Sequence, residues 1–247
     1  MHSLKQALIF AAGLGTRLRP LTDRIPKALV EINGKPMLER LIEKLIAAGI
    51  QNIVINIHHF SKLIIDFVEK HNSFGVNIQF SDEADQLLDT GGGLKKAFSL
   101  FDPNLPLLLH NVDVVSNVDL NQLAEFHKES ESIATLFVQK RISSRYLLFD
   151  ENLKLCGWRN YKTGEKILVF NNDDKLIEMA FNGIHIVNPQ LVKLITEEGK
   201  FSIIPVYLRL ALSYKIFGFR DDDAFYLDVG NNENLAKAIS LLKKYDV

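Results

Sequence analysis

The sequence predicts a three-layer α/β/α sandwich built around a mixed, mostly parallel β-sheet. Short apolar runs alternate with amphipathic helical patterns over the first half of the chain, and this alternation is typical of parallel sheets with helices on both faces. With 247 residues, 47% of them hydrophobic and 24% charged, the composition is that of a globular domain. We therefore expect one Rossmann-like domain over residues 1–247, divided into halves at 1–140 and 141–247.

The first half begins with a buried strand and continues in regular alternation. The apolar run Gln6–Ala11 predicts this strand, and apolar residues at i, i+3 and i+4 between Pro36 and Gly49 predict the first helix. The same two patterns predict the elements that follow: strand Asn52–Ile57, helix Ser61–His71, strand Val76–Phe80, helix Leu94–Phe101, strand Pro106–His110, helix Leu120–Glu131 and strand Ile133–Val138.

After Arg141 the alternation gives way to shorter elements. Three strand-like runs separated by turn-forming residues are typical of antiparallel hairpins beside the main sheet; they are Tyr146–Phe149, Leu153–Trp158 and Ile167–Phe170. Longer elements then return: strand Leu176–Val187, a helix opened by Pro189, and helices Ile203–Ser213 and Glu233–Lys244.

Charge and cysteine content exclude several classes of protein. With 29 basic and 30 acidic residues, the formal net charge is −1, so no overall field favours nucleic acid or an anionic membrane. One cysteine, Cys156, rules out an intrachain disulfide and fits a reducing compartment. The apolar run Ala7–Ala12 is not followed by a cleavage site, and no run is long enough to span a bilayer. We expect a cytoplasmic protein that binds neither nucleic acid nor membrane.

Two glycine clusters follow strand-like runs, where an open α/β sheet binds its ligands. Gly13 and Gly15 come after the first strand, and Gly91–Gly93 forms the triplet; both clusters are expected in loops. Arg17 adds positive charge to the first loop, which suits a polyphosphate. Leu18 replaces the third glycine of the dinucleotide fingerprint, and no Gly-Lys-Ser/Thr motif occurs. The sequence thus indicates a phosphate-binding loop of neither of these two kinds.

A longer motif around this loop resembles a known family. The string AAGLGTRLRPLT, followed after three residues by PKALVEINGKPMLE, is similar to the signature GxGTRLxPLT and PKxLxxxxGKPxL of the sugar-1-phosphate nucleotidylyltransferases. Weaker similarity continues through DTGGGLKKA, HNVD, FNGIHIVNP and YLDVGNNENL, and so covers nearly the whole chain. The resemblance implies a GT-A-like nucleotidyltransferase fold. It also implies transfer of a nucleotidyl group from UTP, GTP or CTP to a sugar 1-phosphate, with release of pyrophosphate.

The resemblance also implies roles for individual residues. Such a transfer depends on positioning the reactants and neutralising their charge. The catalytic residues would be Arg17, which stabilises charge on the leaving pyrophosphate, Lys27, which holds phosphate, and Asp113, which together with Asp228 would bind Mg²⁺. The first half would bind the nucleotide, through Ala11, Ala12, Gly13, Gly15, Thr16, Gly91 and Gly92, and the second half the sugar phosphate, through Arg159, Asn182 and Gly183.

The sequence departs from the family pattern at two places, and two alternative functions stay open. Val112 precedes Asp113 where the family usually has Gly, and GWRN (157–160) replaces the Glu-x-Lys-Pro segment that holds the sugar phosphate. One alternative is a non-catalytic nucleotide-sugar-binding regulatory module on the same fold. Another is a choline-phosphate cytidylyltransferase-like enzyme, in which aromatic side chains bind the quaternary ammonium; the candidates are Trp158, Tyr161 and Phe225.

The chain resembles the short members of the family, because 247 residues leave no room for the C-terminal β-helix of the longer ones. Short members include those that act on N-acetylmuramate 1-phosphate, mannose 1-phosphate or heptose 1-phosphate, and the sequence does not rank these sugars. We expect a monomer or a small homo-oligomer.

Overall fold

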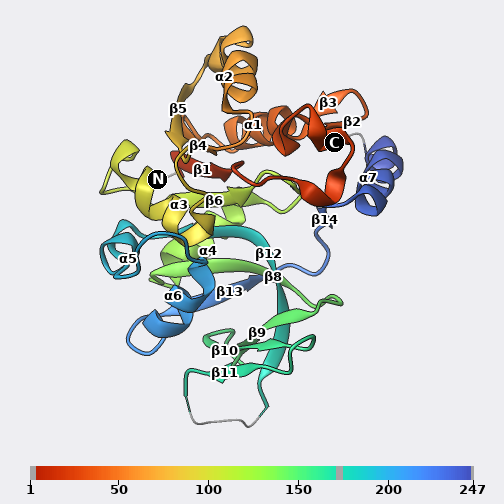
Figure 1. Ribbon diagram of the computed structural model, residues 1–247. Coiled ribbons are helices and arrows are strands. Elements are labelled where there is room, and N and C mark those ends of the chain that lie inside the picture. The colour runs from red at the N-terminus through yellow and green to blue at the C-terminus, as the bar shows by residue number, and fades with distance from the viewer. Residues whose placement is uncertain (1–3, 171–174, 246–247) are drawn as a thin grey trace.

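The computed structural model describes residues 4–170 and 175–245 and contains one large mixed sheet (Figure 1). Its strands lie in the order β11-β10-β9-β12-β6-β1-β4-β5, and β8 pairs with both β12 and β13. Their bounds are β1 (Gln6–Phe10), β4 (Asn52–Ile57), β5 (Asn77–Asp82), β6 (Leu107–Asn111), β8 (Ala134–Gln139), β9 (Arg145–Phe149), β10 (Leu155–Asn160), β11 (Lys166–Leu168), β12 (Ile177–Val187) and β13 (Ile216–Arg220).

The parallel core of the sheet comes from the first half of the chain. Strands β5, β4, β1 and β6 are parallel neighbours. Next to them, β12 runs antiparallel to β6 and β8 and then continues to pair with β9. The hairpins predicted after Arg141 therefore extend the main sheet through the 11-residue strand β12.

Helices cover both faces of this sheet. One face carries α1 (Met37–Ala47), α2 (Ser61–Lys70) and α4 (Leu120–Glu129), and the other carries α3 (Asp89–Ala97), α5 (Pro189–Lys193) and α6 (Ile203–Leu210). Successive side chains of a strand point to opposite faces, so alternate residues of β1 belong to different cores. Ile9 lies in the core under α1, α2 and α4, and Leu8 lies in the core under α3, α5 and α6. The predicted three-layer sandwich is confirmed. No helix in the described ranges is long and apolar enough to cross a bilayer.

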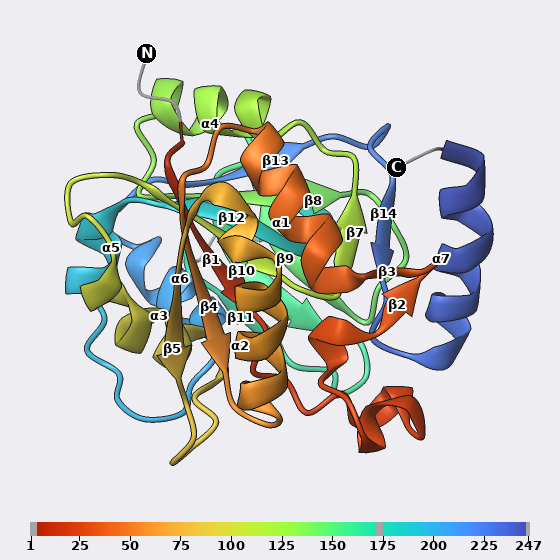
Figure 2. The same ribbon diagram turned by 90° about the horizontal axis from the view of Figure 1, so that it is seen from above.

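Two small ribbons and the last helix lie at one side of the sandwich. Strand β7 (Val114–Ser116) pairs with β14 (Tyr226–Asp228), and β2 (Glu31–Ile32) pairs with β3 (Lys35–Pro36). Figure 2 shows α7 (Asn232–Tyr245) beside both ribbons. Leu235 of this helix packs in one cluster with Leu18 and Val229. Helix α7 is thereby held against the loop that follows β1.

The structure corrects the prediction that Gly91–Gly93 lies in a loop. These glycines form part of α3, which begins at Asp89 and ends at Ala97. A Cβ on Gly91 would lie 2.3 Å from the Phe201 ring, and one on Gly92 would lie 2.3 Å from the Gly199 carbonyl oxygen. Close packing against another segment therefore outweighs the low helix propensity of glycine. The prediction also omitted β2, β3, β7, β13 and β14, each of five residues or fewer.

Candidate active site

The loop after β1 is held in a tight conformation by Gly15. This residue has a φ of 63°, and a Cβ there would lie 2.9 Å from the Thr22 side chain. Its carbonyl oxygen accepts hydrogen bonds from Leu18 N and Thr22 Oγ1, both at 2.8 Å. Thr16 and Arg17 follow in a short 3₁₀ turn. The left-handed conformation explains why glycine is required at this position.

A buried polar pair anchors the first residues of this loop. Ala11 N and Ala12 N donate to Asn56 Oδ1 at 2.6 and 3.3 Å. Asn56 Nδ2 in turn donates to Glu83 Oε1 at 2.7 Å, and Leu88 N donates to Glu83 Oε2 at 2.8 Å. Asn56 and Glu83 are 3% and 1% exposed. The two predicted nucleotide-binding alanines therefore have their N–H groups occupied by Asn56. Of the two, Ala12 lines the adjoining cavity.

Four charged residues from distant parts of the chain meet at the carboxyl edge of the sheet. Lys27 Nζ forms an ion pair with Asp113 Oδ2. Burial, followed by the negative charge of Asp113, raises the pKa of Asp228, while Lys27 and Arg17 act to lower it. A Cβ on Gly230 would lie 2.6 Å from both Arg17 Nη2 and Asp228 Oδ1, so the guanidinium and the carboxylate share one small space. The structure thus brings together the catalytic and metal-binding residues predicted from the sequence.

The β7–β14 ribbon explains how Asp113 and Asp228 come close. Asp113 occupies the turn between β6 and β7, and Asp228 at the end of β14 pairs with Val114. Val229 N donates to the Asp113 carbonyl oxygen at 2.8 Å, and Gly230 N donates to Asp228 Oδ1 at 2.7 Å. Backbone pairing therefore fixes the relative position of two carboxylates that are far apart in sequence.

Two cavities meet at this charged cluster. Asp113 and Lys27 line the first, which has a volume of about 280 Å³, and Asp228 lines the second, of about 490 Å³. Other residues of the first cavity are Ala12, Gly13, Asn56, Glu83, Asp89, Thr90 and Lys200. The second contains Asn111, Arg141, Arg145, Tyr146, Trp158, Asn182, Gly183 and Tyr226. The arrangement suits two ligands whose reacting ends meet between the carboxylates.

Two of the three predicted sugar-phosphate residues line the second cavity. Asn182 is fully buried, donates from Nδ2 to Gln139 Oε1 at 3.0 Å, and accepts from Arg141 Nε at 2.8 Å. Gly183 has a φ of 71°, and a Cβ there would lie 2.6 Å from Asn111 Nδ2. Both residues are thus fixed by their neighbours at the cavity wall.

The structure places the third of them, Arg159, away from this wall. Its guanidinium pairs with Glu178 at 3.4 Å and lies 4.4 Å from the centre of the Tyr161 ring. The preceding residue, Trp158, lines the cavity, and neighbouring side chains of a strand point to opposite faces. Arg141, which the sequence reasoning missed, lines the cavity instead.

Gly91 and Gly92 likewise lie outside the lining of the first cavity. Their N–H groups donate to the Phe201 carbonyl oxygen at 2.9 and 3.3 Å. Asp89 and Thr90, directly before them, line the cavity. Gly91 and Gly92 let α3 approach the segment around Phe201, whereas a Cβ on Gly93 would lie 2.8 Å from Glu83 Oε1. Close packing thus explains the triplet without a bound base.

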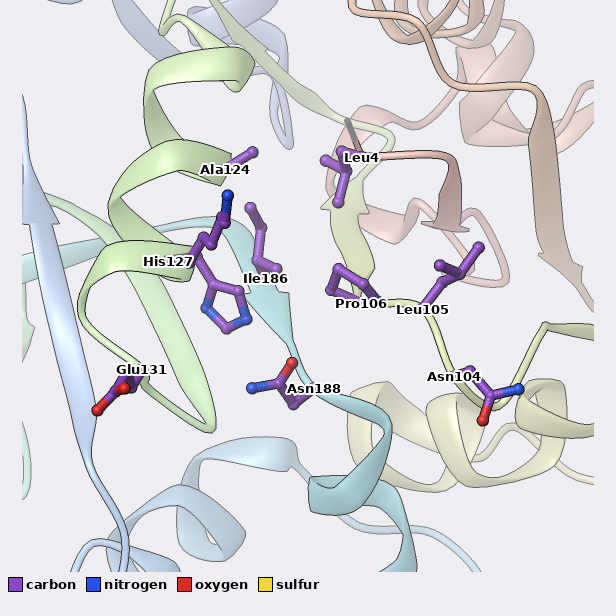
Figure 3. Close-up of a pocket in the computed structure, with 10 residues that line it drawn as sticks. Leu4, Asn104, Leu105, Pro106, Ala124, His127, Glu131, Ile186 and Asn188 are labelled. Atoms are coloured by element: carbon purple, nitrogen blue, oxygen red, sulfur yellow. The ribbon is translucent and has the colours of Figure 1, made fainter. Parts of the chain in front are cut away.

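A third cavity of about 280 Å³ lies at the opposite edge of the sheet (Figure 3). Its wall includes Leu4 and Pro106, which shortly precede β1 and β6, and His127 from α4. His127 Nδ1 lies 2.8 Å from Thr135 Oγ1, and burial lowers the His127 pKa to about 4. None of the site residues predicted from the sequence lines this cavity.

Comparison with known proteins identifies the family. The model of the family described as "Nucleotidyl transferase" matches residues 6–146. This chain belongs to the nucleotidyl transferase family. It is 29% identical over 233 residues to N-acetylmuramate alpha-1-phosphate uridylyltransferase of Caulobacter vibrioides, covering 92% of each chain. It is 33% identical over 244 residues to mannose-1-phosphate guanyltransferase of Yarrowia lipolytica, covering 96% of this chain and 63% of that relative.

Solved structures support the fold of this nucleotidyl transferase. HddC from Yersinia pseudotuberculosis, complexed with GMP-PN, superposes with a TM-score of 0.76 at 24% identity, covering 97% of this chain and 100% of that one. UDP-glucose pyrophosphorylase from Acinetobacter baumanii has a TM-score of 0.80 at 16% identity, covering 97% and 93%. The predicted family, fold class and transferase class are confirmed.

Proposed function

We propose that this nucleotidyl transferase moves a nucleotidyl group from UTP, GTP or CTP to a sugar 1-phosphate. An oxygen of the sugar phosphate attacks the α-phosphorus, the bond from that phosphorus to the β-phosphate oxygen breaks, and pyrophosphate leaves. The observation that carries this proposal is the cluster of Arg17, Lys27, Asp113 and Asp228 between two cavities. The names of the two relatives, both of which refer to sugar 1-phosphates, support it.

Mg²⁺ fits the acidic pair at the centre of this site. Carboxylate oxygens are its preferred protein ligands, with phosphates and waters completing its shell. In the described ranges no group of three His, Cys, Asp or Glu side chains is arranged for a metal, so the phosphates would supply the remaining ligands. Burial, followed by the negative charge of Asp113, raises the pKa of Asp228, and a divalent cation would offset the repulsion between the two carboxylates. Asp113 and Asp228 would hold the ion, which would neutralise phosphate charge.

The remaining residues divide between the two substrates. The nucleotide would occupy the first cavity, against Ala12 and Gly13, with Arg17 and Lys27 stabilising charge on its phosphates. The sugar phosphate would occupy the second, against Asn182 and Gly183. This assignment keeps residues 1–140 as the nucleotide-binding half and 141–247 as the sugar-binding half. A cytoplasmic location fits an enzyme that consumes nucleoside triphosphates.

Pyrophosphate release tests the proposal directly. Purified protein is incubated with Mg²⁺, each of UTP, GTP and CTP, and a panel of sugar 1-phosphates. We expect pyrophosphate only when a matching NTP and sugar phosphate are both present, and none with the Asp113→Asn variant. Binding of nucleotide sugars with no turnover by any pair would instead support the regulatory module. Turnover with choline phosphate alone would support the cytidylyltransferase-like alternative.

A further inference from the structure

The second cavity contains one cation that neighbouring groups hold in a fixed position. The charged residues of its lining are Arg141, Arg145 and Asp228. Under the proposed function, on which this inference rests, Asp228 would hold the metal ion. Two guanidinium groups of the lining are then left to face the acceptor phosphate, and their surroundings differ.

Arg141 is fixed by two hydrogen bonds and by an aromatic ring. Its Nε donates to Asn182 Oδ1 at 2.8 Å, and its Nη2 donates to the Phe181 carbonyl oxygen at 2.9 Å. Its Cζ lies 4.2 Å from the centre of the Tyr226 ring, whose phenol is neutral because burial raises its pKa to about 12. Within residues 4–170 and 175–245, Arg141 forms no ion pair. Neutral partners thus fix this side chain and leave its charge uncompensated.

A series of amide hydrogen bonds supports these contacts. Asn182 is fully buried, and its Nδ2 donates to Gln139 Oε1 at 3.0 Å. Gln139 Nε2 donates in turn to the carbonyl oxygens of Asp221 and Ala224, both at 2.7 Å. These bonds orient both amides, so that the oxygen of Asn182 faces Arg141. They also connect Arg141 with the segment that leads into β14.

Arg141 lies close to the carboxylate pair. Tyr226 and Asp228 are two residues apart on β14, so their side chains share a face of this strand. Besides burial, the charges of Asp228 and Asp113 raise the pKa of Tyr226, and the charge of Arg141 lowers it. The ring on which Arg141 stacks is therefore also near both carboxylates. An anion bound by Arg141 would lie beside the acidic groups that would hold Mg²⁺.

The other arginines of this region are held differently. The Arg145 side chain is exposed and forms neither a hydrogen bond nor an ion pair with the described residues. Arg159 is paired with Glu178 at 3.4 Å and lies outside the lining. A side chain that is already held in place loses less conformational entropy when it binds a ligand. Arg141 is therefore the preorganised cation of the second cavity.

We propose that Arg141 binds the phosphate of the acceptor and holds it beside the carboxylate pair. A guanidinium group has five N–H donors, of which Asn182 and Phe181 engage two, and the others are left for phosphate oxygens. Arg141 neutralises part of the phosphate charge while one phosphate oxygen attacks the α-phosphorus. Its guanidinium stays protonated throughout, so it acts through position and charge.

The single tryptophan of the chain, Trp158, lines the second cavity and reports acceptor binding without turnover. Its fluorescence is titrated with glucose 1-phosphate, mannose 1-phosphate and N-acetylmuramate 1-phosphate, and calorimetry measures the Kd of the NTP. In Arg141→Gln we expect the Kd of the tightest-binding sugar phosphate to rise by roughly 10- to 150-fold, with little change for the NTP. Arg141→Lys should lose less, because it keeps the charge but not the planar donors.

Two control variants remove an arginine elsewhere. Arg145→Gln removes the same charge from the same cavity and should weaken acceptor binding much less than Arg141→Gln. Arg209→Gln on α6, whose arginine pairs with Glu197 outside the cavity, should keep both wild-type Kd values. Thermal unfolding checks that each variant is folded. If Arg141→Gln does not fold, Arg141→Lys decides, since it should still weaken binding of the acceptor alone.

The outcomes separate this inference from the proposed function. An unchanged acceptor Kd in Arg141→Gln, or equal losses in Arg141→Gln and Arg141→Lys, would overturn the role of Arg141, because its charge would not be used. An equal loss in Arg145→Gln, or an equal loss of NTP affinity in Arg141→Gln, would overturn it as well. If the wild type binds no sugar 1-phosphate by fluorescence or calorimetry and releases no pyrophosphate, the proposed function itself is refuted.

Discussion

The two cavities that meet at Asp113 and Asp228 are built from different materials. The first includes the loop after β1, whose backbone N–H groups are fixed by Asn56 and whose lining residues Ala12 and Gly13 have small side chains or none. The second is shaped by long side chains, such as Arg141 and Trp158, that come from separate strands. Backbone geometry permits few residue types, whereas a side-chain wall can be assembled in many ways. The comparison therefore explains why the nucleotide half has a recognisable motif and the sugar half departs from the family pattern.

Substitution of the two carboxylates between the cavities should have the largest effect on turnover. Asp113→Asn or Asp228→Asn is expected to lower turnover by about 10³-fold or more, because each removes a charge that would hold Mg²⁺. Asp228→Asn should leave the fold intact, since it removes repulsion between two carboxylates. Asp113→Asn removes the same repulsion but also the ion pair with Lys27, so we expect it to be the less stable of the two variants. Steady-state rates over a Mg²⁺ titration and thermal unfolding measure both effects. Turnover near wild type in either variant would contradict the shared metal site.

A smaller loss is expected from a residue that acts on the leaving group. Arg17→Ala should lower kcat by about 10²-fold, because its contact with the phosphates strengthens as charge moves to pyrophosphate. The dissociation constant for the NTP should change much less, and calorimetry measures it independently of turnover. If affinity falls as much as kcat, Arg17 serves only in ground-state binding.

The next largest effect is expected from Asn56, whose side chain holds the loop after β1. Asn56→Ala would leave Ala11 N, Ala12 N and Glu83 Oε1 without their buried partner, which costs about 1–3 kcal/mol in unfolding free energy. KM for the NTP should rise while KM for the sugar phosphate stays the same. Gly93→Ala is a matched second variant, because its Cβ would lie 2.8 Å from Glu83 Oε1. Equal changes in both KM values would show that the two cavities are not independent.

These residues also show which parts of the site can be predicted from the sequence. Gly15 belongs to a contiguous motif whose backbone tolerates few alternatives, and Asp113 belongs to the short segment HNVD (110–113), so the resemblance identified both. Asn56 and Glu83 lie at or just beyond the ends of β4 and β5, and the rule that ligands bind at the carboxyl edge of parallel strands would have pointed to them. Local patterns carry no such signal for Arg141, because its position depends on Asn182 on another strand.

The two corrected predictions have the same physical origin. The sequence predicts a loop at Gly91–Gly93 because a local pattern cannot detect the packing of these glycines against Phe201, Gly199 and Glu83. Arg159 is predicted as a replacement donor because GWRN stands where the family has its Glu-x-Lys-Pro segment, yet the strand turns its side chain toward Glu178. Contacts between segments distant in sequence decide both cases. Most strands of the sheet and most of its helices, in contrast, follow from local alternation of apolar residues; the exceptions are the omitted strand β13 and the start of α3, which lies five residues before the predicted one.

The third cavity lies outside both substrate cavities and serves as a reference region. The smallest effect is expected there, on the pH dependence of the unfolding free energy through His127. The pKa of His127 is lowered by burial to about 4 from its ordinary 6.5, so the folded protein holds it neutral while the unfolded chain binds a proton below about pH 6.5. Its contribution to stability is therefore complete above pH 6.5 and is lost as the pH falls toward 4. Between pH 7.5 and 5.5 the loss is about 1.4 kcal/mol.

Urea unfolding of wild type and His127→Gln at the two pH values isolates this contribution, because other titrating groups cancel in the difference. We expect the unfolding free energy of wild type to fall by about 1.4 kcal/mol more than that of the variant. Both KM values at pH 7.5 should be unchanged, since His127 lines neither substrate cavity. An equal pH dependence in the two proteins would mean that the imidazole is protonated in the folded state as well. A changed KM would instead connect this edge of the sheet to the active site.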